Sequence, residues 1–316
     1  MIIDSHQHFW HYDRRRDAWI TEDMPVLQRD FLPEDLIPQL RANLVDGTIA
    51  VQATQSEAET TFLLQLAGQF DEIKAVVGWV DLCAPNLPER LAHFSHFDKL
   101  CGFRHVVQSE PDDRFMLRPE FLTGIRQLQQ FEFTYDILIY PHQLPAAIEL
   151  VERFPRQDFV LDHLAKPLIR SGVVSPWAQQ IRVLAANPNV YCKLSGLLTE
   201  ADWRSWRETD FKPYLDVVFD AFGTDRVMFG SDWPVCLLAA DYRDVKQLLA
   251  GYLNDFPVER RDKIFGGNAE KFYGLKTSHY EPTTERYGCS HHWRSQRNRR
   301  SHRSYYWGRG RHPRDC

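Results

Sequence analysis

The chain has 316 residues, 43% of them hydrophobic and 26% charged, which is typical of a globular protein with a sizeable core. No apolar run reaches the roughly 18 residues needed to span a bilayer, and the N-terminus lacks a secretory signal pattern, so we expect a cytoplasmic protein without a membrane partner. The net charge of −5 divides between residues 277–316, which carry nine arginines and three acids for a balance of +6, and residues 1–276, which carry −5 − 6 = −11.

Short apolar or aromatic runs alternate with segments of helical spacing along residues 1–276. Eight strands are predicted near residues 2–8, 47–53, 75–81, 100–106, 133–140, 158–163, 190–195 and 226–232. Helices are predicted near residues 33–41, 57–70, 87–94, 119–130, 144–154, 176–186 and 212–222, and two more near 242–252 and 258–265. This alternation predicts an α/β protein with a parallel (β/α)8 TIM barrel. A doubly wound sheet is disfavoured because no glycine-rich phosphate-binding motif follows the first strand.

The first predicted strand carries two histidines, His6 and His8, one residue apart. Strand alternation places Asp4, His6 and His8 on one face. Two neutral imidazoles that project together can bind one divalent ion or stabilise one anionic transition state. A pair of this kind is more often structural when it stands alone, so its interpretation depends on Asp232, which ends the eighth strand.

The segment between the first strand and the first helix, residues 9–30, is long, charged and aromatic. A loop of this length in a compact domain is usually functional or disordered. Its tryptophans favour a lid over the active site, and a surface excursion packed on the barrel rim is an equal alternative.

Barrel active sites form at the C-terminal ends of the strands, where this sequence places many polar residues. These residues are His6, His8, Asp81, Arg104, His105, Tyr140, His142, His163, Lys193, Ser195 and Asp232. Each has a structural explanation by itself. Three histidines and an aspartate at strand ends are harder to explain as core filling, because buried polar groups are costly without partners.

Five motifs together resemble the amidohydrolase superfamily, and within it the sugar-lactonase branch that includes L-fuconolactonases, L-rhamnonolactonases and 2-pyrone-4,6-dicarboxylate lactonases. The motifs are Asp4-Ser5-His6-Gln7-His8-Phe9-Trp10, Gly102-Phe103-Arg104-His105, Leu161-Asp162-His163-Leu164-Ala165-Lys166-Pro167, Lys193-Leu194-Ser195-Gly196 and Gly230-Ser231-Asp232-Trp233-Pro234. The resemblance covers residues 1 to about 275 and stops at the arginine-rich segment.

The resemblance implies hydrolysis of a sugar lactone in carbohydrate catabolism, with Asp232 as the general base. His6, His8 and His163, with Asp232, would hold one divalent metal ion, zinc being the first choice, or the histidines would stabilise the oxyanion directly. Whether a metal is required stays open, because a lactone is more electrophilic than an amide. Strand four offers Arg104 and His105 in place of a bridging ligand, so we expect no two-metal centre.

Substrate contacts are predicted from two kinds of side chain. Donors to hydroxyl groups are Arg104, His105, Tyr140 and Lys193, and apolar faces for the ring are Trp10, Trp79 and Trp233. Since Arg104 is the one clear arginine among them, a neutral aldonolactone is favoured over a dicarboxylate. Asp162 is expected to face outward, because its neighbour His163 faces in.

Two other functions remain as alternatives. One is the metal-dependent, non-oxidative decarboxylation of an aromatic acid, and the other is a barrel that binds a ligand without turnover. Residues 277–316 have a low-complexity, arginine-rich composition and are predicted to be disordered and outside the chemistry. Nucleic-acid binding by that segment is a weaker alternative. A homo-oligomer is compatible with the sequence.

Overall fold

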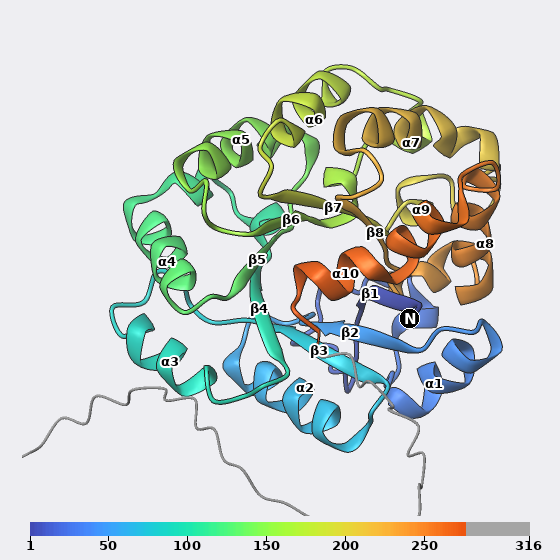
Figure 1. Cartoon of the computed structure of the whole chain (residues 1–316). Coiled ribbons are helices and arrows are strands. Elements are labelled where there is room, and N and C mark those ends of the chain that lie inside the picture. The colour runs from blue at the N-terminus through green and yellow to red at the C-terminus, as the bar shows by residue number, and fades with distance from the viewer. Residues whose placement is uncertain (276–316) are drawn as a thin grey trace, which may run out of the picture. The chain divides into compact units, whose positions relative to one another are not determined.

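The computed structural model describes residues 1–275, and the predictions for residues 277–316 lie outside that range. Eight parallel strands lie in the order β1 to β8 in one sheet that curves into a nearly closed barrel (Figure 1). They are β1 Ile3–Gln7, β2 Gly47–Val51, β3 Ile73–Gly78, β4 Leu100–His105, β5 Thr134–Ile137, β6 Phe159–Leu161, β7 Val190–Leu194 and β8 Val227–Phe229. Each overlaps its predicted range, so the predicted (β/α)8 barrel is confirmed.

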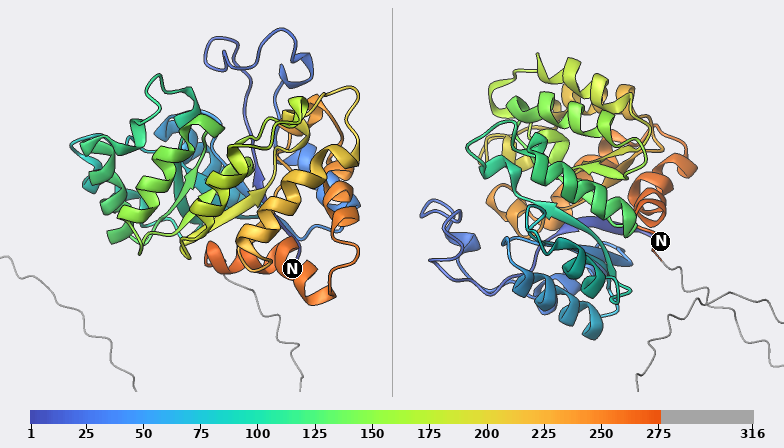
Figure 2. Two further views of the ribbon diagram at one scale, coloured as in Figure 1. Left: turned by 90° about the horizontal axis from the view of Figure 1, so that it is seen from above. Right: turned by 90° about the vertical axis from the view of Figure 1, so that its left-hand side faces the viewer.

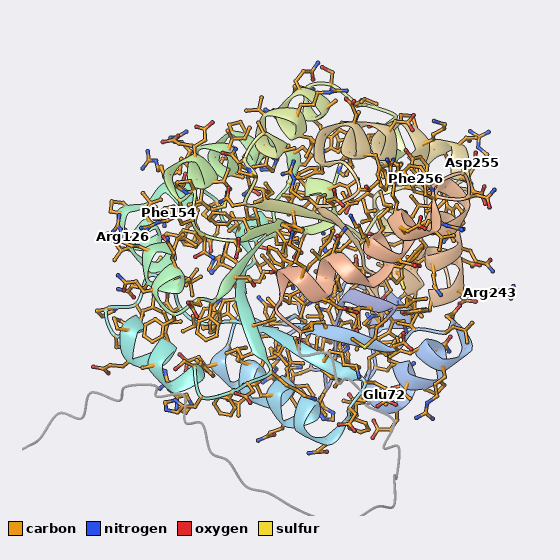
Figure 3. The ribbon with its side chains drawn as sticks, in the orientation of Figure 1. Glu72, Arg126, Phe154, Arg243, Asp255 and Phe256 are labelled. Atoms are coloured by element: carbon orange, nitrogen blue, oxygen red, sulfur yellow. The ribbon has the colours of Figure 1, made fainter. Side chains whose placement is uncertain are left out.

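Helices follow the strands, and all but the last of them form the outer layer (Figure 1). They are α1 Pro33–Ala42, α2 Glu57–Gln69, α3 Leu87–Phe94, α4 Pro119–Gln130, α5 Leu144–Arg153, α6 Trp177–Ala185, α7 Glu208–Phe222, α8 Tyr242–Tyr252, α9 Val258–Asp262 and α10 Asn268–Phe272. Exposed charged side chains such as Arg243 and Asp255 lie at the periphery (Figure 3). Within residues 1–275, no helix is both long enough and apolar enough to cross a membrane.

One end of the barrel is closed by α10. Apolar side chains of β1, β2, β3, β6 and β8 form one buried cluster with Ala269, Phe272 and Tyr273. The start of the chain lies against this segment: a Cβ on Gly266 would be 1.9 Å from the carbonyl oxygen of Met1, so only glycine fits there. Because α10 blocks the N-terminal ends of the strands, an active site can open only at the other end.

The barrel closes between β1 and β8 through side chains as well as backbone. The carboxylate of Asp4 accepts hydrogen bonds from the backbone N–H (2.8 Å) and hydroxyl (2.6 Å) of Ser231 and from the hydroxyl of Tyr242 (3.0 Å). The pairing of β1 with β2 is irregular between Asp4 and Gln7, so strict alternation is lost there. The prediction that Asp4 shares the face of the two histidines is therefore wrong.

The segment between β1 and α1 rises from the open end of the barrel, opposite α10 (Figure 2, left). It has a small aromatic core, in which Trp10 contacts Phe31 and Trp19 at ring-centroid distances of 5.4 and 5.8 Å. Its short 3-10 helix η1 (Pro25–Leu27) contacts the 3-10 helix η8 (Val235–Leu238) that follows β8. The segment thus packs on the rim beside the loop that carries Asp232.

Candidate active site

Three histidines surround one carboxylate oxygen at the open end of the barrel. Oδ1 of Asp232 lies 3.4 Å from Nε2 of His8, 3.8 Å from Nε2 of His6 and 3.9 Å from Nε2 of His163. All four side chains are buried. β1, the loop after β6 and the loop after β8 bring them together from positions more than 200 residues apart in the chain. We call this group the histidine cluster.

The backbone is strained where it presents two members of the histidine cluster. His163 and Asp232 have φ values of 51° and 58°, in the left-handed region, which costs most residues other than glycine, asparagine and aspartate about 1–2 kcal/mol. Two glycines leave room for the histidines. A Cβ on Gly196 would lie 2.6 Å from Nδ1 of His163, and one on Gly230 would lie 2.7 Å from Cβ of His6. Strain of this kind is characteristic of functional sites.

Burial sets the charge of the histidine cluster. It lowers the pKa of His163 to about 4 and holds the pKa of His6 well below its usual value, so both imidazoles are neutral near pH 7. Burial alone would raise the pKa of Asp232, but the surrounding histidines outweigh it and keep that pKa below its usual range. Neutral imidazoles beside an ionised carboxylate are the protonation states that metal ligands require.

The donor set fits a divalent metal ion. Nδ1 of His8 donates to the carbonyl oxygen of Val51 (2.7 Å), which leaves the lone pair of Nε2 directed at the cluster. Nε2 of His6 lies only 3.2 Å from Nε2 of His8, and two such nitrogens are stable this close only with a proton or a cation between them. Ligand atoms of His6, His8 and Asp232 lie within 4.8 Å of one another, so one ion can reach all three.

Arg104 and Lys193 lie beneath the histidine cluster rather than on its open side. Nη1 of Arg104 is 3.1 Å from Asp162 and 3.3 Å from Nε2 of His6. Nζ of Lys193, with no exposed surface, is 2.5 Å from Asp136 and 3.1 Å from both Asp162 and His6. This enclosure does not suit the predicted contact of Lys193 with substrate, and we reassign Lys193 to the support of the cluster.

Asp162 is also placed differently from its prediction. It is fully buried and points into the barrel, where it pairs with Arg104 and Lys193. Strand β6 ends at Leu161, and the chain enters the left-handed region at His163, so the alternation on which the prediction depended stops one residue too early. The prediction that Asp162 faces outward is wrong.

His105 and Trp79 do not join the histidine cluster. The ring of His105 stacks on Phe115 with centroids 4.9 Å apart, and its Nε2 lies 2.7 Å from Glu110. Nε1 of Trp79 points at Nδ1 of the same histidine (3.4 Å). Since His105 follows the inward-facing Arg104 on β4, it faces the helices. These contacts indicate a packing role for His105, while the substrate contact of Trp79, which is partly exposed, stays a prediction.

Two of the predicted tryptophan contacts are buried in the aromatic packing of the rim. Trp10 and Trp233 are each 3% exposed, and Phe31 contacts both, with centroid distances of 5.4 and 5.3 Å. Neither presents an open face to a ring. Their placement indicates that they anchor the β1–α1 segment to the loop after β8.

The remaining predicted substrate contact, Tyr140, is 38% exposed at the end of β5. Nζ of Lys166 lies 5.6 Å from the centre of its ring and 3.8 Å from the carboxylate of Glu200. Burial and the charge of Asp232 raise the pKa of Glu200, which places this carboxylate near the histidine cluster. No site role was predicted for Lys166 or Glu200; the signal that could have indicated Lys166 is its place three residues after His163.

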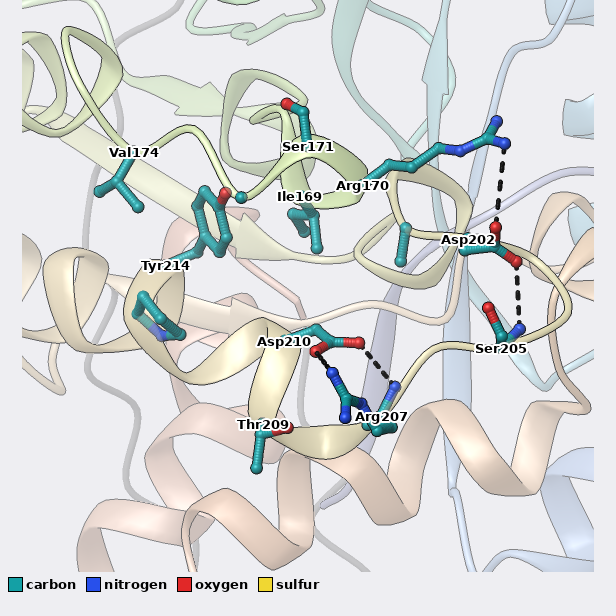
Figure 4. A pocket seen from close by; sticks show the side chains of 13 residues that line it. Ile169, Arg170, Ser171, Val174, Asp202, Ser205, Arg207, Thr209, Asp210 and Tyr214 are labelled. Atoms are coloured by element: carbon teal, nitrogen blue, oxygen red, sulfur yellow. Dashed lines mark hydrogen bonds and ion pairs between the residues drawn. The ribbon is translucent and has the colours of Figure 1, made fainter.

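A separate cavity of about 560 Å³ lies beside the N-terminus of α7 (Figure 4). Its lining includes Arg170, Asp202, Arg207 and Asp210 and none of the predicted site residues. Arg170 pairs with Asp202 and Arg207 with Asp210, so these charges already have partners. We therefore place the chemistry at the histidine cluster and not in this cavity.

Known proteins similar to this chain indicate one family. Residues 3–275 match the family model described as amidohydrolase. An L-fucono-1,5-lactonase from Burkholderia multivorans is 44% identical over 284 residues, which cover 86% of this chain and 96% of the relative. An L-fucono-1,5-lactonase from Burkholderia ambifaria is 37% identical over 86% of this chain and 95% of the relative.

A solved structure is similar as well. It is an amidohydrolase from Burkholderia multivorans with bound zinc, 44% identical, with a TM-score of 0.84 over 87% of this chain and 100% of the other.

Proposed function

Because this chain belongs to the amidohydrolase family, as its sequence motifs predicted, we propose that it hydrolyses the lactone ring of a sugar acid of the L-fucono-1,5-lactone type. The observation that carries the proposal is the histidine cluster: three imidazoles around one ionised carboxylate at the open end of a barrel. The similarity to two L-fucono-1,5-lactonases supports the choice of a lactone.

Asp232 is the group best placed to activate water. It is ionised, and its Oδ1 lies within 4 Å of all three imidazole Nε2 atoms. As base, it removes a proton from water while the water oxygen attacks the lactone carbonyl. The tetrahedral oxyanion forms beside the imidazoles and above the guanidinium of Arg104. When the ring C–O bond breaks, the protonated carboxyl returns its proton to the leaving oxygen, which becomes a hydroxyl.

His6, His8 and Asp232 would hold a single divalent ion, and His163, whose Nε2 lies 3.9 Å from Asp232, would complete the ligand set. Zinc is our choice because a similar solved structure contains it. When bound, the ion would polarise the carbonyl and lower the pKa of water. That chemistry suits Asp232, since a carboxylate with a lowered pKa is a weak base by itself. We keep the single-metal assignment, because Arg104 occupies the position on β4 where a second metal would need a ligand.

Substrate recognition falls to side chains at the rim. We assign it to the ammonium of Lys166, the carboxylate of Glu200 and the hydroxyl of Tyr140, which lie near one another on the loops after β6, β7 and β5. A donor and an acceptor side by side match the vicinal hydroxyl groups of a sugar lactone. Because Glu200 balances the charge of Lys166, a neutral substrate is favoured over a dicarboxylate.

Three further assignments follow the sequence analysis. We propose that residues 1–276 form the whole catalytic unit, that the enzyme acts in the cytoplasm, and that it contributes to sugar-acid catabolism. Lactone hydrolysis fits that last role because it delivers an open-chain acid to the reactions that consume it.

The deciding experiment follows acid release with a pH indicator when the purified full chain meets L- and D-aldonolactones and 2-pyrone-4,6-dicarboxylate. We expect rapid acid release from L-fucono-1,5-lactone and its close stereoisomers. Treatment with a chelator, followed by zinc, tests the metal in the same assay. No acid release from any lactone would overturn the proposal, and carbon dioxide release from a hydroxybenzoate would replace it with decarboxylation.

A further inference from the structure

A column of buried polar groups runs from the closed end of the barrel to the histidine cluster. The hydroxyl of Tyr273 lies 3.0 Å from Oδ2 of Asp136, which is 2.5 Å from Nζ of Lys193. This Nζ is 3.1 Å from Oδ1 of Asp162, which in turn is 3.3 Å from Nδ1 of His6. These side chains are buried, and the mechanism above uses only His6.

Two opposite partners compete for Nδ1 of His6. Nζ of Lys193 lies 3.1 Å from it and, as an ammonium, can only donate. Donation by Lys193 leaves the imidazole proton on Nε2, where it can be given to Nε2 of His8 at 3.2 Å. Since His8 uses its own proton for the carbonyl of Val51, this arrangement pairs the two imidazoles with each other without a metal ion. Nη1 of Arg104, 3.3 Å from Nε2 of His6, is a donor that opposes it.

A metal ion at the histidine cluster needs the other tautomer. A ligand nitrogen must offer a lone pair, so the proton of His6 must lie on Nδ1 when Nε2 binds metal. Oδ1 of Asp162 is the carboxylate oxygen beside Nδ1, and among the described residues it is a buried acceptor that lacks a well-aligned hydrogen bond. A proton on Nδ1 would fill that position.

We propose, building on the proposed function, that Asp162 is a positioning residue that turns His6 into a metal ligand by accepting the proton of Nδ1. Arg104 holds the other oxygen of Asp162 at 3.1 Å and so fixes the carboxylate. Lys193 stabilises the metal-free tautomer by donating to Nδ1 of His6. When Nδ1 carries the proton and donates to Asp162, the ammonium of Lys193 keeps its ion pair with Asp136.

Zinc affinity tests the proposal without turnover. We would titrate the metal-free full chain with zinc against a chromophoric chelator for the parent, Asp162→Asn and a control, Asp158→Asn. Asp158 is an exposed aspartate at the opposite end of the same strand, so the control makes the same chemical change away from the site. Loss of a carboxylate behind a ligand histidine typically weakens metal binding 10–100-fold. We expect that loss for Asp162→Asn alone; parent affinity in this variant would overturn the proposal.

The imidazole tautomer gives a second readout that needs no variant at Asp162. Two-bond ¹H–¹⁵N spectra of the parent, with the His6 signals assigned from the spectrum of His6→Asn, report which ring nitrogen carries the proton. We expect the proton on Nε2 in the metal-free protein and on Nδ1 after zinc addition. The same tautomer in both states would overturn the proposal. Neither measurement uses a lactone, so a failure of the proposed hydrolysis would be seen separately, in the acid-release assay.

Discussion

Replacement of Asp232 by asparagine removes the proposed base with little change of shape. General base catalysis contributes about 10²–10⁴-fold to rate, which corresponds to about 3–5 kcal/mol of transition-state stabilisation. The variant also loses the negative charge that lies within 4 Å of three imidazole nitrogens. We therefore expect kcat for the best lactone to fall at least 100-fold in the acid-release assay.

The fold of Asp232→Asn should survive, because asparagine is among the few residues that tolerate the left-handed φ of 58° at this position. Its thermal unfolding midpoint should lie within a few degrees of the parent's. Asp232→Ala is the matched contrast, since alanine adds about 1–2 kcal/mol of backbone strain to the same loss of charge. A folded Asp232→Asn protein whose kcat stays within about threefold of the parent would refute the assignment of the base.

Three other predictions address the support of the site. In Gly196→Ala, the added Cβ would meet the ring of His163 at 2.6 Å on a backbone with a φ of 63°, so we expect a lower kcat and a loss of about 1–3 kcal/mol in the free energy of unfolding by urea. Tyr273→Phe removes the phenol that donates to the buried carboxylate of Asp136 and should cost about 1–3 kcal/mol in the free energy of unfolding. Tyr135→Phe removes a buried hydroxyl that makes no well-aligned hydrogen bond among the described residues and should cost less; equal losses would contradict this account. In metal-free protein, the pKa of His163 is lowered from 6.5 to about 4, so the unfolded state binds the extra proton and stability should rise from pH 4 to 6.5 by about 3 kcal/mol on its account. The raised pKa of Asp4, about 6, acts in the opposite direction, so the measured quantity is the difference between the parent and His163→Gln in urea unfolding across this pH range, and parallel curves would count against the low pKa.

The order and positions of the strands could be predicted because each strand is a short apolar run and eight such runs alternate with amphipathic helices. The histidine cluster was found for a related reason. In a parallel barrel, the C-terminal end of every strand opens on the same face, so polar residues at the strand ends could be assigned to one site from sequence order. The resemblance to the amidohydrolase motifs then singled out His6, His8, His163 and Asp232.

The predicted orientations of individual side chains were wrong where the backbone leaves regular strand geometry. The irregular pairing after Asp4 and the left-handed turn after Asp162 each moved a carboxylate to an unexpected face. The sequence also did not indicate how deeply a side chain is buried. Lys193 was predicted at the end of the seventh strand as a substrate contact, but its distance from solvent depends on Asp136 and Asp162, which other parts of the barrel supply. The spacing within one strand carries no information about such partners.

Charge balance inside the barrel bears on whether a metal takes part in the reaction. Arg104 and Lys193 supply two positive charges, while Asp136, Asp162 and Asp232 supply three negative charges. Burial raises the pKa of Asp136 to about 6, so it is mostly ionised near pH 7, and the imidazoles of His6 and His163 are neutral.

Together, these two cations and three carboxylates carry a net charge near −1, which would oppose a developing oxyanion. One divalent ion changes that charge to about +1, which favours the oxyanion and leaves Asp232 ionised beside it. The electrostatics therefore favour a metal-dependent lactonase over a metal-free one. Chelator treatment tests this directly: we expect kcat to fall more than tenfold and to return with zinc, and full activity in the metal-free protein would show that Arg104 and the imidazoles stabilise the oxyanion by themselves.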